Sequence, residues 1–145
     1  MFIAPMSTLN RESPGNGDRR GATAVEFAIV APIFFLFLLA AFEFGWLNVL
    51  RHTADNAAYE AARAGMVPGA TAADAVAKAN SILKVIKTRN ATVTVTPSVI
   101  NEATDQVTVA IEIPLISNAL VVPRFTKGKS IHASSTLRTE RADKG

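Results

Sequence analysis

The most informative part of this chain is residues 19–32, which read Arg-Arg-Gly-Ala-Thr-Ala-Val-Glu-Phe-Ala-Ile-Val-Ala-Pro. A basic pair and a glycine stand directly before a long apolar run. One carboxylate, Glu26, lies inside that run, five residues after Gly21. An ionisable group among lipid-facing residues costs several kcal/mol. We therefore expect Glu26 to have both a partner and a function.

The apolar run has the length and composition of a membrane span. No charged residue occurs from Phe27 to Phe42, and the segment stays apolar as far as Leu50. It is apolar on all sides, unlike the one-sided helix of a soluble protein. At about 1.5 Å per residue, Glu26 and Glu43 are about 26 Å apart. A bilayer core is about 30 Å thick, so these carboxylates should lie near its two faces.

The span reads as a retained anchor rather than a secretory signal peptide. Its apolar stretch is longer than a signal core, and no small-residue cleavage site ends it cleanly. Trp46 follows where interfacial aromatic residues gather. Arg19 and Arg20 hold the amino-terminal flank in the cytoplasm. The sequence thus predicts a single-pass protein of the cytoplasmic membrane, with its carboxyl-terminal domain outside.

Pro32 interrupts the interior of this helix. A proline removes one backbone donor and crowds the carbonyl of Ala28, which predicts a kink or local loosening. In lipid, the freed carbonyl needs another partner. Two interpretations stay open. Pro32 is either a weak point that lets the helix change shape between bilayer and assembly, or a tolerated membrane-helix proline.

The glycine, the Glu26-Phe27 pair, the basic pair and the apolar helix together resemble the processing site of type IV pilin-like proteins. The chain is most similar to the TadE-like family of tight-adherence (Flp-type) pilus assembly proteins. The similarity extends through the helix to the small residues of Ala57 to Gly65. It weakens in the middle of the distal domain and returns in the terminal pattern, residues 133–141.

This resemblance implies that a prepilin peptidase, a membrane-embedded aspartyl protease, cuts between Gly21 and Ala22. Met1–Gly21 would then be a cleavable leader, and its polar, turn-rich composition predicts disorder before removal. Cleavage creates an ammonium group at Ala22, one helical turn from Glu26. In related assemblies this carboxylate is thought to pair with the new amine of an adjacent subunit. An unpaired buried charge is costly, whereas a paired one sets the register.

The resemblance also implies a minor pilin-like (pseudopilin) role with defined partners. These are the prepilin peptidase, other pilin-like subunits with the pilus assembly machinery, and membrane lipid. We assign Pro32 and Glu43 to assembly and helix packing. The alternative is an unprocessed single-pass, membrane-anchored extracytoplasmic binding module. The sequence does not distinguish a pilus subunit from a tip component or an assembly initiator.

The transmembrane helix, residues 22–50, should continue as an extension over residues 51–66. One face of this extension carries small residues at three- and four-residue spacing. They are Leu50, Ala54, Ala57, Ala58, Ala61 and Gly65. A face of this kind permits close backbone approach, either to the protein's own domain or to another subunit. Both alternatives stay open here.

The remaining residues, 67–145, predict a small α+β domain with a helix against a three-stranded antiparallel sheet. Thr71 and Asp74 resemble a capping box, with Asp in place of Glu, at the start of a second helix. Alternating apolar residues predict the strands. The expected helix is 72–87, and the expected strands are 91–96, 106–113 and 131–137. Between the last two strands, Pro114–Pro123 is apolar and reads as a loop or a short helix.

Several function classes find no support in the sequence. The chain has no cysteine and two histidines, so we predict neither a metal site nor a cofactor. Ser134 and Ser135 have no evident base partner, and no glycine-rich phosphate loop appears. Basic residues are scattered, and Phe125 is the only aromatic residue of the distal domain. We therefore expect a protein that is not an enzyme and binds neither nucleic acid nor a small-molecule substrate.

Overall fold

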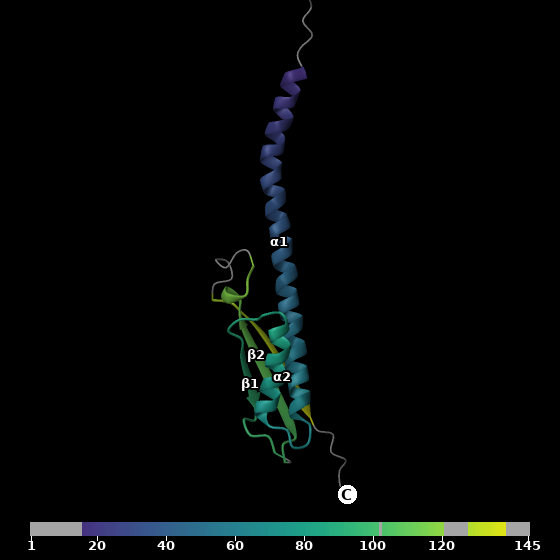
Figure 1. Ribbon diagram of the computed structural model, residues 1–145, viewed down its shortest axis with the longest axis vertical. Coiled ribbons are helices and arrows are strands. Elements are labelled where there is room, and N and C mark those ends of the chain that lie inside the picture. The colour runs from purple at the N-terminus through teal and green to yellow at the C-terminus, as the bar shows by residue number, and fades with distance from the viewer. Residues whose placement is uncertain (1–15, 102, 121–127, 139–145) are drawn as a thin grey trace, which may run out of the picture. The chain divides into compact units, whose positions relative to one another are not determined.

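The computed structural model describes residues 16–101, 103–120 and 128–138 of the 145-residue chain, with side chains from residue 21 onward. The elements are α1 (Asn16–Gly65), α2 (Ala72–Val85), β1 (Thr92–Thr96), β2 (Gln106–Pro114), a 3-10 helix η1 (Leu115–Ser117) and β3 (Ser130–Arg138) (Figure 1). This confirms the predicted α+β fold with a long amino-terminal helix, a second helix and a three-stranded antiparallel sheet.

The chain divides into an amino-terminal unit, Met1–Leu38, and a carboxyl-terminal unit, Leu39–Gly145. In the part of the chain that the structure describes, α1 is the helix long and apolar enough to cross a membrane. Side chains of the amino-terminal unit are mostly exposed, including the large apolar ones from Val25 to Phe37. A helix that presents apolar side chains on all sides fits a lipid environment.

Two expectations for the amino-terminal unit concern Pro32 and the leader. The α-helix runs through Pro32 without interruption, so any loosening there does not end the helix. The predicted disorder of the leader is wrong for residues 16–21, which are the first residues of α1. Extending an existing helix adds one hydrogen bond for each residue fixed, whereas starting one is costly. Residues 1–15 lie outside the described residues.

The small-residue face of α1 lies in the core of the chain's own domain. Ala54, Ala57, Ala58 and Ala61 are fully buried in a cluster with the apolar side chains of β2. This resolves the alternative that the sequence left open. At Gly65 the fit is tight, since an added Cβ would lie 3.2 Å from Ile100 Cδ1 and 3.3 Å from Val107 Cγ1. Small side chains therefore let the helix approach the sheet closely.

The capping box at the start of α2 is confirmed. The Thr71 hydroxyl accepts the Asp74 backbone N–H at 3.3 Å, and Asp74 Oδ2 accepts the Thr71 backbone N–H at 2.8 Å. Asp74 Oδ2 also accepts the Thr71 hydroxyl proton at 2.7 Å. The bond from this hydroxyl and the bond from the Thr71 backbone N–H lower the pKa of Asp74 from its ordinary value of 3.8.

The carboxyl end of α2 comes two residues earlier than predicted. Lys87 adopts a left-handed conformation, with φ of 55°, and this ends the helix. Its N–H donates to the Lys84 carbonyl at 3.0 Å, and the Thr88 N–H donates to the Leu83 carbonyl at 3.2 Å. This is a Schellman motif, in which glycine usually takes the place of Lys87.

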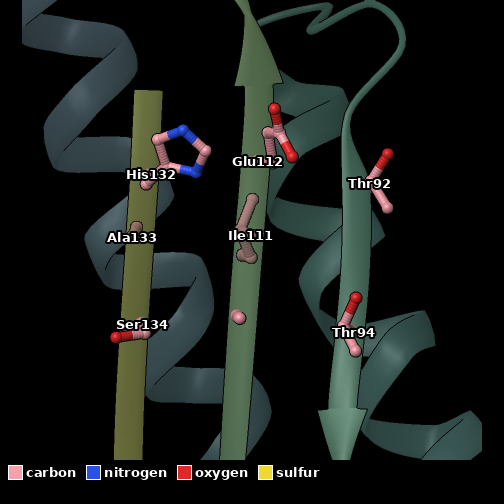
Figure 2. A pocket seen from close by; sticks show the side chains of 8 residues that line it. Thr92, Thr94, Ile111, Glu112, His132, Ala133 and Ser134 are labelled. Atoms are coloured by element: carbon pink, nitrogen blue, oxygen red, sulfur yellow. The ribbon is translucent and has the colours of Figure 1, made fainter. Parts of the chain in front are cut away.

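The three predicted strands are confirmed to within one residue, in the order β1-β2-β3 with both pairings antiparallel. Central strand β2 alternates strictly, with Val107, Val109, Ile111 and Ile113 buried. Both helices lie behind this apolar face, and the opposite face is open (Figures 1 and 2). The segment after β2 forms η1, a short helix as one of the two alternatives proposed, with Leu115 buried. Residues 121–123 of that segment lie outside the described residues.

We predict that Ala79→Leu destabilises the carboxyl-terminal unit, whereas Ala77→Leu does not. Both alanines are in α2, but Ala79 is fully buried and Ala77 is exposed. Forcing a larger side chain into a packed core costs about 1–3 kcal/mol. Denaturant unfolding of the full chain in detergent, followed by fluorescence of the single tryptophan, Trp46, would measure this. Equal midpoints for the two variants would contradict the packing described above.

Candidate functional site

The predicted processing residues lie on the first turns of α1. Gly21, Ala22, Glu26 and Phe27 are all helical and exposed, and the Phe27 side chain is 70% exposed. Residues four apart are neighbours on one side of a helix, so Ala22 and Glu26 share a side. Apart from its two chain neighbours and the nearby backbone of its own helix, no described atom lies within 4 Å of the position that a Cβ on Gly21 would take. Within the described residues, the chain leaves the Gly21–Ala22 bond open to an approaching molecule.

The two residues assigned to assembly and helix packing belong to different units. Pro32 is in the amino-terminal unit and Glu43 is in the carboxyl-terminal unit. Glu43 is half-buried, and its carboxylate accepts the Leu120 backbone N–H at 3.1 Å and 3.3 Å. Glu43 thus joins α1 to the chain that follows η1. A carboxylate that accepts a backbone N–H has part of its hydrogen-bonding capacity satisfied inside the protein.

One turn further along α1, Trp46 makes a second contact with the same segment. Its indole Nε1–H donates to the Asn118 carbonyl oxygen at 2.6 Å. Glu43 and Trp46 are three residues apart on one side of α1. They hold Asn118 and Leu120, which are two residues apart in sequence. We call this arrangement of four residues the α1–η1 link.

Asn118 is the centre of the α1–η1 link, and it is buried. Its Nδ2 donates to the Arg89 carbonyl at 2.9 Å and to the Pro114 carbonyl at 2.8 Å. Its Oδ1 accepts the Arg89 backbone N–H at 2.8 Å. Both side-chain donors are therefore used, as a buried amide requires. The amide connects the end of β2 with the turn between α2 and β1, while the Asn118 carbonyl reaches α1.

The sequence reasoning missed the α1–η1 link. It placed Glu43 and Trp46 near a bilayer face but gave neither a partner within the chain. One signal was available, because Asn118 is a polar residue inside the apolar stretch Pro114–Pro123. A buried amide in such a stretch needs hydrogen-bond partners, and these come from segments that are distant in sequence.

The open face of the sheet carries a shallow hollow of about 240 Å³. Thr92 and Glu112 are partners across β1 and β2, and Glu112 and His132 are partners across β2 and β3. Figure 2 shows the His132 ring on the side of Glu112, while the Ser134 hydroxyl points the other way. A nucleophile and its base need hydrogen-bond reach, which this arrangement does not give.

Across residues 16–101, 103–120 and 128–138, no three or more His, Cys, Asp or Glu side chains gather in a group suited to a metal ion. The hollow at Glu112 and His132 brings together two such residues. The candidate functional residues of the described chain are therefore those at the start of α1 and those of the α1–η1 link.

These features define a class of protein. A single helix that is long and apolar enough to span a membrane, joined to a small α+β domain, fits a single-pass membrane protein. A family model described as TadE-like protein matches residues 21–63. This match supports the TadE-like family for this chain and a general role in tight-adherence pilus assembly. The matched region begins at Gly21 and ends within α1.

Two further comparisons add no relative. A search of curated proteins found no match. A search of solved structures also found none. The likeness to known proteins that these comparisons give is therefore the one over residues 21–63.

We predict that Asn118→Ala destabilises the carboxyl-terminal unit by roughly 2–4 kcal/mol, because it leaves backbone groups of Arg89 and Pro114 without a partner. The fluorescence emission of Trp46 should also change, because the Asn118 carbonyl that accepts its indole N–H is no longer held in place by the Asn118 side chain. Asn80→Ala is the matched control, since Asn80 is exposed on α2. Denaturant unfolding of the full chain in detergent would compare the two. Equal stability of both variants would remove the central role of Asn118.

Proposed function

We propose that this protein is a minor pilin-like component (pseudopilin) that assembles a tight-adherence (Flp-type) type IV pilus. It is inserted in the cytoplasmic membrane with Arg19 and Arg20 inside and the carboxyl-terminal unit outside. A prepilin peptidase then cuts after Gly21. The observation that carries this proposal is the TadE-like match, which begins at the same glycine that precedes the Glu26-Phe27 pair.

The position of Gly21 in α1 supports the cleavage step. A protease binds its substrate in an extended form, so the first turns of α1 must open. Glycine makes a helix interior about 1 kcal/mol less stable than alanine does, which favours opening at this point. Hydrolysis breaks the Gly21–Ala22 bond with one water molecule, leaving a carboxylate on Gly21 and an ammonium on Ala22.

The new ammonium changes the electrostatics of Glu26. Before cleavage, Glu26 is an exposed carboxylate at the start of an apolar helix. An ionisable group among lipid-facing residues costs several kcal/mol. An ammonium from the Ala22 of an adjacent subunit supplies the opposite charge and fixes the axial register of two helices. Cleavage is thus the step that makes a subunit competent to assemble.

A second candidate function is the unprocessed anchored binding module. The polar hollow on the open face of the sheet, with Glu112 and His132 opposite each other, is the observation that favours it. In this alternative the leader stays on the chain and the carboxyl-terminal unit binds its partner at the membrane surface. The fate of the leader distinguishes the two functions.

The leader should be absent from the mature protein. We expect mass spectrometry of membrane-extracted protein to give a chain that begins at Ala22 in a host with the prepilin peptidase. The full chain should persist in a peptidase-deficient host. A Gly21→Val variant should also retain Met1–Gly21, because its side chain blocks the close approach that glycine allows. An intact leader in the peptidase-positive host would instead favour the anchored binding module.

Replacing Glu26 by alanine should stop pilus assembly while membrane insertion and leader removal persist. Removing one partner of a buried ion pair costs about 3–5 kcal/mol, which weakens the association of subunits roughly a hundredfold or more. Pili on cells would be counted by electron microscopy, and insertion would be checked by alkaline extraction. Glu60→Ala is the control, since Glu60 lies beyond the predicted span and is 3.9 Å from Arg63. Normal pili from Glu26→Ala would exclude the pairing role.

A further inference from the structure

Two large apolar side chains are exposed at the end of the domain where η1 lies. Ile116 is 50% exposed and Leu120 is 60% exposed, whereas Leu115, the first residue of η1, is buried. The segment 115–120 therefore directs one apolar residue into the core and two outward. Single exposed apolar side chains are ordinary on a protein surface, so these two indicate a contact only together with the residues that lie beside them.

The α1–η1 link places these side chains beside an apolar part of α1. Glu43 holds the Leu120 backbone, and Trp46 holds the Asn118 carbonyl. On the same stretch of α1, Phe42 is 63% exposed and Phe44 is 74% exposed. All these residues belong to the carboxyl-terminal unit. The exposed residues of segment 115–120 are thus continuous with the end of the apolar span, where Trp46 fits the interface of a bilayer.

Basic residues are attached to the same end of the domain. The Arg89 backbone is bonded to the Asn118 amide at 2.8 Å and 2.9 Å. The Leu115 N–H donates to the Lys129 carbonyl at 3.0 Å. Arg89 and Lys129 are both exposed. Apolar residues flanked by cations match the chemistry of an anionic lipid surface, where acyl chains lie beneath negative headgroups.

We propose that segment 115–120, with Arg89 and Lys129, is a second membrane contact of this protein. Ile116 and Leu120 enter the boundary between headgroups and acyl chains of the bilayer that α1 spans, and the two cations bind anionic headgroups. This inference rests on the anchoring of α1, which is part of the proposed function. A second copy of the chain fits less well, because a symmetric contact would bring the same cations together.

The contact gives the helix a second attachment to the membrane. Because Glu43 and Trp46 connect α1 to segment 115–120, insertion of Ile116 and Leu120 sets how deep the end of the span lies. Interfacial anchors of this type fix the position and rotation of a transmembrane helix.

Depth-dependent quenching tests the proposal directly. The chain has no cysteine, so single variants Ile116→Cys and Leu120→Cys can each carry one environment-sensitive fluorophore. The full chain is reconstituted in phosphatidylcholine vesicles with or without phosphatidylglycerol. Lipids with a spin label near the headgroup, or deep in the acyl chain, serve as quenchers of two depths. Val99→Cys is the matched control, since Val99 is 71% exposed in the turn between β1 and β2. Phe35→Cys reports insertion of α1.

We expect the deep label to quench position 35 and the headgroup label to quench positions 116 and 120, whereas neither label quenches position 99. Quenching at 116 and 120 should be stronger when phosphatidylglycerol is present. If position 35 is quenched but positions 116 and 120 are quenched no more than position 99, the contact of segment 115–120 with the membrane is overturned. The anchoring of α1 then remains. No quenching at 35 would overturn both. Fluorophores at 116 and 120 could instead be shielded from the spin label at a high ratio of protein to lipid and lose that shielding when more lipid is added. That result would assign the surface to a second copy of the chain and overturn the membrane contact.

Charge variants test the role of the cations. The double variant Arg89→Gln with Lys129→Gln should lose most of the gain in quenching at position 120 that phosphatidylglycerol gives. The control double variant, Arg63→Gln with Lys78→Gln, removes the same charge from exposed positions outside segment 115–120 and its two cations. It should keep that gain. Equal loss in both double variants would show a general charge effect and overturn the assigned headgroup contacts.

Discussion

The close approach of α1 to its own sheet is the constraint on which the rest of the structure depends. It requires small side chains on one face of the helix, and Ala54, Ala58 and Ala61 are fully buried there. At Gly65 an added Cβ would already be within 3.3 Å of two side chains. The same helix presents Phe and Leu on all sides before Leu38. One continuous helix therefore meets two environments, and its composition changes accordingly.

Polar contacts at the two ends of the domain complement this apolar packing. At one end, the capping box of Thr71 and Asp74 starts α2, and it lies near the end of α1. At the other end, Asn118 joins the turn before β1 to the end of β2, and Trp46 and Glu43 extend the connection to α1. Buried amides with all donors used specify one arrangement of the segments around them.

Much of this fold was predictable from the sequence because its signals are local. The alternation of Val107, Val109, Ile111 and Ile113 has the period of a strand, and Thr71 with Asp74 is a capping signature. The end of α2 was not predictable, because Lys87 adopts a conformation that usually favours glycine. The α1–η1 link was missed since Trp46 and Asn118 are distant in sequence, and no local pattern relates them. The processing residues rest on a resemblance, and the fold tests only their helical, exposed positions.

The outward face of the sheet has a consequence for how this domain meets other molecules in a crowded setting. Short hydroxylated side chains cover much of it, and Thr108 bonds Thr136 across β2 and β3 at 2.8 Å. Threonine favours an extended backbone and adds little apolar surface. These residues thus favour the strand conformation and offer little apolar surface for association with another sheet. At high protein concentration this face should therefore stay hydrated and should not promote aggregation. Contacts between molecules would then form through other surfaces.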